Sequence, residues 1–217
     1  MLKLSLLVGL VGCATPGPLF SDHDGPRGAV YDDGTSIRVT GCPDGAAFGC
    51  HTPAPGDAMT ATVDGVKHVV PESSEGAMQD QLLGVFSDGP YQLTLPRPAD
   101  GRLGLELAGA VGSFVLPTGF AVTRPTAQVS RAQVLTIQHE VLPGAQVWGL
   151  ILTTCGTREH TDLVEEQTPG VLEVAFPSDF AGTCTHDIHV DQRVVISGGE
   201  LAIDAIRIAQ VAVTSTP

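Results

Sequence analysis

The sequence predicts an all-β protein that folds as two β-sandwich domains after a short N-terminal segment and a flexible tether. Its 217 residues are 42% hydrophobic and only 16% charged, a composition typical of a folded chain that can bury one large or two small cores. From residue 35 onward, short apolar runs alternate with polar residues at period two. Gly, Pro or Asp-Gly turn signals bound each run, and only residues 75–83 could form a short helix.

The N-terminal segment has the features of an export signal. Lys3 carries one positive charge, and residues 4–12 form an uncharged apolar run that is too short to span a bilayer as a helix. Cys13 ends this run and is followed by residues 14–18, Ala-Thr-Pro-Gly-Pro, which suit neither helix nor strand. We interpret residues 1–12 as a signal peptide with a small-residue cleavage site.

Residues 10–13, Leu-Val-Gly-Cys, resemble the lipobox of bacterial lipoproteins. The resemblance implies that the signal is removed before Cys13, that Cys13 is acylated, and that the protein is anchored in the bacterial cell envelope, at the outer membrane. More than one acyl chain on Cys13 would give a stable anchor. An ordinary secretory signal or a buried apolar strand remains the alternative for the same residues.

The next segment, residues 13–34, is rich in Pro, Gly and Asp and is predicted to be a flexible tether. The phrase Asp32-Asp33-Gly34 resembles a fragment of a calcium loop, but no closing Glu follows at the required spacing. We interpret it as an Asp-Gly turn. The first sandwich domain is then expected over residues 35–118 and the second over residues 119–217.

In the first domain, alternation places Leu103, Leu105 and Leu107 on one buried face. Asp64-Gly65 joins two apolar runs as a hairpin turn, because both residues tolerate positive φ. The predicted strands are residues 36–40, 59–63, 66–70, 82–86, 91–95, 103–107 and 113–116.

In the second domain, residues 147–152 are apolar on both faces and predict a central strand, with Trp148 in the core. At the carboxyl end, Ile206 and Ile208 lie in one phase and Val211 in the other, which predicts a bulge near residues 209–210. The residues expected to point inward are Leu172, Val174, Phe176, Ile188 and Val190. The predicted strands are residues 120–123, 134–139, 147–154, 170–176, 185–195 and 205–213.

Four cysteines remain after Cys13, an even number that predicts disulfides in an exported chain. Pairing within each half closes the shorter loops, so we expect Cys42 to pair with Cys50 and Cys155 with Cys184. On the chain-entropy model the second bond would contribute about 3.6 kcal/mol. A zinc site that uses Cys42, Cys50 and the neighbouring histidine is the alternative, but its spacing matches no compact zinc module.

Three phrases in the second half carry a further resemblance: residues 116–125 (LPTGFAVTRP), 128–131 (QVSR) and 180–184 (FAGTC). Together with a Trp-containing strand, they resemble the immunoglobulin-like domains of uncharacterised envelope lipoproteins from high-GC bacteria such as myxobacteria. The resemblance implies an immunoglobulin-like sandwich over residues 116–217. It implies no activity and no site.

The strongest candidate for chemistry is a row of Asp187, His189 and Asp191 on one face of a predicted strand, opposite Ile188 and Val190. These side chains could ligate a divalent metal ion. They also lie about 7 Å apart along a strand, so a solvated outer face is the alternative.

Other catalytic patterns are missing or incomplete. His139-Glu140 lacks the second His of a zinc-protease helix, and no Gly-x-Ser-x-Gly phrase occurs. Residues 197–200, Ser-Gly-Gly-Glu, are predicted to be a hairpin turn, and residues 162–167 a charged loop. We therefore expect no enzymatic activity and no cofactor.

A formal net charge of −13 argues against nucleic acid as a partner. The expected function is a binding or structural module with an unknown ligand, held on the membrane through Cys13 and able to contact another envelope protein. Two alternatives are a divalent-ion or carbohydrate-binding envelope protein and a secreted hydrolase whose site is assembled from loops.

Overall fold

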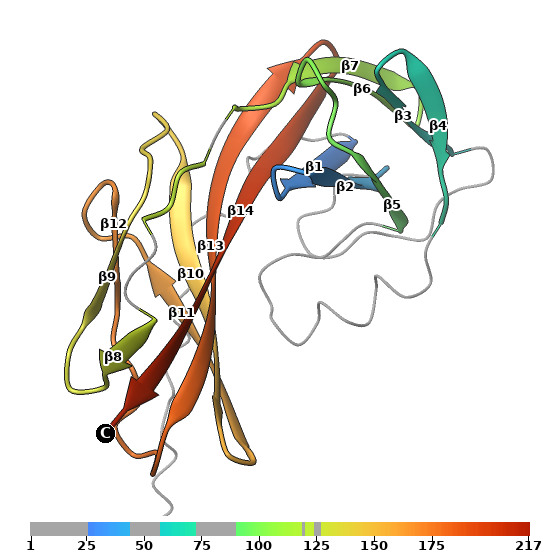
Figure 1. The fold of residues 1–217 in the computed structure, drawn as a ribbon. Helices are drawn as coiled ribbons and strands as arrows, with labels where there is room; N and C mark the ends of the chain where they lie inside the picture. The colour runs from blue at the N-terminus through green and yellow to red at the C-terminus, as the bar shows by residue number, and fades with distance from the viewer. Residues whose placement is uncertain (1–25, 44–56, 73–89, 119, 124–126) are drawn as a thin grey trace, which may run out of the picture.

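The computed structural model describes residues 26–43, 57–72, 90–118, 120–123 and 127–217, and in these residues it is all-β with no helix (Figure 1). The all-β prediction is confirmed. The strands are β1 (Arg27–Asp32), β2 (Ser36–Cys42), β3 (Met59–Val63), β4 (Val66–Val70), β5 (Tyr91–Pro96), β6 (Arg102–Leu107), β7 (Ala110–Val115), β8 (Gln128–Ser130), β9 (Leu135–Gln138), β10 (Gln146–Cys155), β11 (Arg158–Glu165), β12 (Val171–Val174), β13 (Cys184–Gly198) and β14 (Leu201–Thr216).

Three sheets are formed. The largest has the order β11-β10-β13-β14-β1-β2-β5, with β8 pairing beside the end of β14. The second has the order β4-β3-β6-β7, and the third consists of β12 and β9. In Figure 1 the long β13 and β14 strands run from the two-stranded sheet to the four-stranded sheet. The large sheet therefore connects the two ends of the molecule.

The first core lies between the four-stranded sheet and one end of the large sheet. The β3–β4 hairpin turns at Asp64 and Gly65, whose φ values of 50° and 78° confirm the predicted turn. β6 contributes Leu103, Leu105 and Leu107, all buried as predicted. Its other principal members are Val30, Ile37, Val39, Met59, Ala61, Tyr91, Leu95, Phe114, Leu116, Leu201 and Ile203.

The second core lies between the β12–β9 sheet and the other end of the large sheet. All five residues predicted to point inward here are buried. β10 is paired on both sides, with β11 and β13, as expected for an internal strand. The core consists of Leu135, Ile137, Val147, Ile151, Leu172, Val174, Phe176, Ile188, Val190, Val211 and Val213.

A polar seam lies between the two cores. Nε of Arg97 donates to the Asp32 carboxylate at 2.9 Å, and Nη2 of Arg97 donates to the Pro117 carbonyl at 3.0 Å. Arg207 is opposite Asp32 in the β1–β14 register, is buried, and lies over the Phe120 ring at 5.1 Å. The Arg97–Asp32 pair satisfies one buried carboxylate, whereas Nη2 of Arg207 has no hydrogen-bond partner among the described residues.

The predicted boundary between residues 118 and 119 does not fully separate the residues of the two cores. Leu201 and Ile203 come from the predicted second domain, yet they belong to the first core. The β13–β14 hairpin turns at Gly199 and Glu200 against β7, which is close enough for the Val111 carbonyl to accept from the Glu200 amide at 3.0 Å. The predicted turn at residues 197–200 is confirmed, whereas a two-domain division remains a prediction.

The tether prediction is wrong between residues 27 and 32. β1 pairs with β2 on one side and with β14 on the other, so it is an internal strand. Its apolar run is only three residues, Ala29 to Tyr31, between Gly28 and Asp32, too short for periodicity to reveal it. Long-range pairing stabilises this strand. The turn after it does match the prediction, since Asp33 accepts hydrogen bonds from the Thr35 and Ser36 amides.

The predicted bulge is also wrong. β13 and β14 pair without an offset from Cys184–Ser215 to Gly198–Leu201. Ile206 and Val211 do point to opposite faces, but both are buried. The middle of β14 is covered on both faces, so a change in hydrophobic phase does not require an extra residue here.

Two more predictions differ from the structure, and one strand was not predicted. Residues 162–165 belong to β11 and not to a charged loop, because pairing with β10 satisfies their backbone. Residues 120–123 make only a single bridge, from Val122 to His139. The short β8 was not predicted. The helix at residues 75–83 and the strand at residues 82–86 lie outside the described residues.

Candidate functional site

The predicted row of Asp187, His189 and Asp191 lies on one face of β13, as alternation requires. Ile188 and Val190 are fully buried on the opposite face. Nε2 of His189 is 3.7 Å from Oδ2 of Asp187, and both side chains are partly exposed. The sequence prediction of which residues share this face is confirmed.

Asp187 lies in an open groove that crosses β10, β13 and β14, with a volume of about 910 Å³. The amide nitrogen of Gln210 donates to both carboxylate oxygens of Asp187, at 2.9 and 2.8 Å. Leu152, 38% exposed, adds an apolar side chain to the groove. The other residues of the lining are Ala127, Thr154, Thr185, His186, Val211, Ala212, Val213 and Thr214.

Asp191 is in a different environment from the rest of the row. It lies opposite Trp148 in the β10–β13 register, and the Trp148 indole donates a hydrogen bond to its carboxylate. Oδ1 of Asp191 is buried without a hydrogen-bond partner among the described residues. Burial raises the pKa of this carboxyl to about 6, while nearby His189 and the Trp148 hydrogen bond act in the opposite direction. Trp148 is 5% exposed, which confirms it as a core residue.

The row therefore consists of a partly exposed Asp187–His189 pair and an Asp191 whose Oδ1 is buried. In the described part of the chain, no three His, Cys, Asp or Glu side chains come together as metal ligands would. The geometry gives the metal prediction no support beyond the Asp187–His189 pair.

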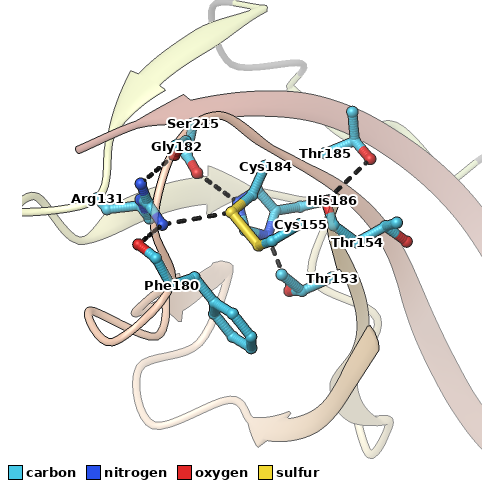
Figure 2. The surroundings of a disulfide bond; sticks show 10 residues. All are labelled: Arg131, Thr153, Thr154, Cys155, Phe180, Gly182, Cys184, Thr185, His186 and Ser215. Carbon is cyan, nitrogen blue, oxygen red and sulfur yellow. Dashed lines mark hydrogen bonds between the residues drawn. A yellow bond between two sulfur atoms is a disulfide. The ribbon is translucent and has the colours of Figure 1, made fainter. Parts of the chain in front are cut away.

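The predicted disulfide between Cys155 and Cys184 is confirmed and joins β10 to β13 beside the groove (Figure 2). Cys42 is also disulfide-bonded. Cys50, its predicted partner, lies outside the described residues, as does Cys13, so the first pairing and the lipid anchor remain predictions. The described residues include no helix long and apolar enough to cross a membrane.

Arg131 holds the loop that leads to this disulfide. Its guanidinium donates to the Phe180 carbonyl at 2.6 Å, to the Gly182 carbonyl, and to Sγ of Cys184 at 3.3 Å (Figure 2). Arg131 is only 7% exposed, so these bonds replace the water that the charged group would otherwise bind. The loop is fixed at both ends, by Arg131 and by the disulfide.

Sequence reasoning did not single out His186, which the structure places at the centre of a polar cluster. Its Nδ1 is 2.8 Å from Oγ1 of Thr153, and its Nε2 is 2.7 Å from Oγ of Ser215. The ring packs against Phe176 with centroids 4.0 Å apart. The signal was present in the sequence, because His186 has the same strand phase as the buried Ile188.

A histidine between two hydroxyls suggests proton transfer, but this one is sealed. His186 is 1% exposed and Ser215 is fully buried. Burial, and to a lesser degree the Arg131 charge, lowers the pKa of His186 to about 4, so the ring is neutral at pH 7. Among the described residues, the ring's hydrogen-bond partners are hydroxyls and include no carboxylate that could orient it for general-base catalysis. The cluster satisfies buried polar atoms and gives the hydrolase alternative no support.

His139 is a second buried histidine, and it contacts Glu166. Its Nε2 is 3.0 Å from Oε1 of Glu166, and the Gly170 amide donates to the same carboxylate oxygen at 2.5 Å. The Phe120 ring lies 6.1 Å away. These contacts attach the end of β9 to the segment between β11 and β12, which is a structural role.

No protein-family model matches this chain, and no curated protein matches it. A chain of a cytokine receptor complex matches at 12% identity over 84% of this chain and 94% of that one, with a TM-score of 0.25. A mutant of Salmonella alpha-2-macroglobulin matches at 12% identity over 89% of this chain and 15% of that one, with a TM-score of 0.29. A tandem-repeat part of the extending region of a large adhesion protein matches at 13% identity over 88% of this chain and 49% of that one, with a TM-score of 0.25. Likenesses this distant carry no argument about function.

Proposed function

We propose that this chain is a lipid-anchored bacterial envelope protein that acts as a binding or structural module and not as an enzyme. The observation that carries the proposal is the continuous large sheet, in which β13 and β14 supply residues to both cores. Such a sheet makes a stiff body that can hold a surface at a fixed distance from its anchor. The lipobox-like sequence at Cys13 supports the anchor.

In this proposal the two ends are immunoglobulin-like sandwiches, one around each core, which share β13 and β14. Support comes from the paired sheets that enclose each core and from the resemblance of residues 116–217 to immunoglobulin-like envelope lipoprotein domains. The likeness is one of fold, so it supplies no ligand.

The groove at Asp187 is the binding surface that we propose. Asp187 and Gln210 place a carboxylate and an amide in the groove, next to exposed Leu152. Thr154 and Thr185 add hydroxyl groups. A rigid surface that combines apolar area with fixed polar groups suits a protein partner in the envelope.

Carbohydrate is a second candidate ligand for the same groove. Sugar hydroxyls both donate and accept, and the groove offers the Asp187 carboxylate, the Gln210 amide and threonine hydroxyls. Isothermal titration with envelope polysaccharide fragments would show saturable heat in this case. Asp187→Asn would abolish that heat, whereas Glu173→Gln, exposed on β12 in another sheet, would not.

The anchor is tested by separating membrane and soluble fractions of cells that make the protein or its Cys13→Ser variant. The proposal expects the wild type in the membrane fraction, labelled by a fatty-acid analogue, and the variant unlabelled. A wild-type chain that takes up no fatty acid contradicts the proposal.

The binding surface is tested by photo-crosslinking in intact cells. A photoreactive residue at Gln210 should give one product of defined mass. The same residue at Glu173, exposed on β12, is the matched control and should give none. Identical products at both positions, or no product at Gln210, would rule out the groove as the contact surface.

A further inference from the structure

β11 is the exposed edge of the large sheet. It pairs with β10 over its full length, Arg158 to Glu165, and no described residue pairs with its other side. Its side chains are exposed or only partly buried on both faces. A free strand edge presents unpaired N–H and C=O groups and can accept another strand.

The usual protections of an edge are incomplete in β11. The strand contains no proline and no lysine, and its pairing with β10 has no bulge. Its protection consists of charges, carried by Arg158, Glu159, Asp162 and Glu165, and of the titratable His160. Like charges that lie directly opposite each other destabilise a pair of strands. The charges of β11 therefore restrict which partner strand, and which register, can pair with it.

A second copy of the chain is the partner that these charges fit. In an antiparallel pair related by a two-fold axis perpendicular to the sheet, each residue opposes one on the same face. When the axis passes through Thr161, His160 lies opposite Asp162 of the second copy. By symmetry, Asp162 lies opposite His160 of the second copy. The same register opposes Thr161 to itself and Glu159 to Leu163, so no like charges meet.

The register centred on Asp162 is unfavourable. Centring the axis at Asp162 opposes Asp162 to itself and Glu159 to Glu165 of the second copy, which places three like-charge pairs in direct contact. An axis placed midway between two residues would oppose side chains that point to different faces of the sheet, so it gives no allowed register. The sequence of β11 therefore fits itself in the Thr161-centred register and is repelled in the Asp162-centred one.

Within one chain, Nε2 of His160 already lies 2.9 Å from Oδ2 of Asp162, and both side chains are about half exposed, at 42% and 45%. Leu163 is 48% exposed. These groups are accessible and already complementary. We propose that two copies of the chain associate through antiparallel β11 edges centred on Thr161, which joins their large sheets into one.

Cysteine crosslinking of the full chain in mild detergent tests the proposal. Thr161→Cys should form a covalent dimer under mild oxidation, on the order of ten-fold more than the matched control Thr136→Cys, which is exposed on β9. The wild type measures any contribution from the native cysteines. Equal yields from Thr161→Cys and Thr136→Cys would overturn the proposal.

The register is tested by two further variants. Glu159→Cys and Leu163→Cys should each dimerise poorly alone but crosslink to each other when mixed. Adding Thr161→Lys to both chains should abolish this mixed product, because two lysines would then face each other at the axis. Dimers from Glu159→Cys alone that match the mixed yield would overturn the Thr161-centred pairing.

Discussion

At the scale of residues, burial favours the uncharged form of two titratable side chains on β13. His186 faces inward, where burial lowers its pKa to about 4. Asp191 faces the other side of the sheet, where burial raises its pKa to about 6. Their effects on stability therefore have opposite pH dependence.

The first prediction concerns His186. The unfolded side chain titrates near 6.5 and the folded one near 4, so the unfolded state binds more protons between these pH values. The stability that depends on neutral His186 is fully present above pH 6.5 and is lost as the pH falls toward 4. We expect urea unfolding to show a larger loss between pH 7.5 and 4.5 for the wild type than for His186→Gln. Equal losses would contradict the assignment.

The second prediction concerns Asp191. Its folded pKa of about 6 exceeds the ordinary Asp pKa of 3.8, so the stability from its protonated form is present below pH 3.8 and is lost as the pH rises through 6. Asp191→Asn keeps an acceptor for Trp148 and removes the charge. It should raise the free energy of unfolding at pH 7.5 by about 1–2 kcal/mol, with no gain at pH 4.

Asp187→Asn is the control for this second prediction, because Asp187 is exposed and its charge costs little in water. It should change the free energy of unfolding by less than about 0.5 kcal/mol. A loss of stability in Asp191→Asn at pH 7.5 would mean that a positive charge compensates Asp191.

Alternation in the sequence correctly predicted which residues of β13 share a face, and loop length predicted the Cys155–Cys184 bond. Alternation did not predict that Oδ1 of Asp191, on the face opposite Ile188, would be buried. Period two divides a strand into two faces, but what covers each face depends on distant parts of the chain.

At the scale of elements, strands with a local signal were predicted best. β3 and β4 were predicted with the observed ends, because apolar alternation and the Asp64-Gly65 turn both specify them. β1 and β11 were missed because a short apolar run or a charged run carries no such signal. Their pairing with distant strands decides their structure.

The third prediction concerns the β13–β14 turn. A Cβ on Gly198 would collide with the Ser113 carbonyl and would lie 2.9 Å from the Phe114 ring of β7. Gly198→Ala should therefore destabilise the protein by about 2–3 kcal/mol in urea unfolding. Ser197→Ala, exposed at the neighbouring position, should be nearly neutral. A neutral Gly198→Ala would show that the turn does not pack on β7.

At the scale of the whole molecule, the two cores are joined by strands and by the polar seam. β14 supplies Leu201 and Ile203 to one core and Val211 and Val213 to the other. Neither core is complete without this strand. The sequence indicated two halves, but the sharing of β13 and β14 depends on pairings that no local pattern reveals.

The fourth prediction is that both cores unfold together. Trp148, the only tryptophan, reports on the end of the molecule that holds the second core. Its fluorescence should change at the same urea concentration at which the amides of β3 and β6, beside the first core, lose protection from hydrogen exchange. Exchange of β3 and β6 while Trp148 fluorescence remains native would show two independent domains.

The most direct test of the proposed envelope function is the intact mass of the protein extracted from its native membrane fraction, before and after reduction. We expect an acylated chain from Cys13 to Pro217 whose mass rises by about four daltons on reduction, two for each disulfide. A full-length, unlipidated chain with free thiols would contradict both the anchor and the oxidising compartment.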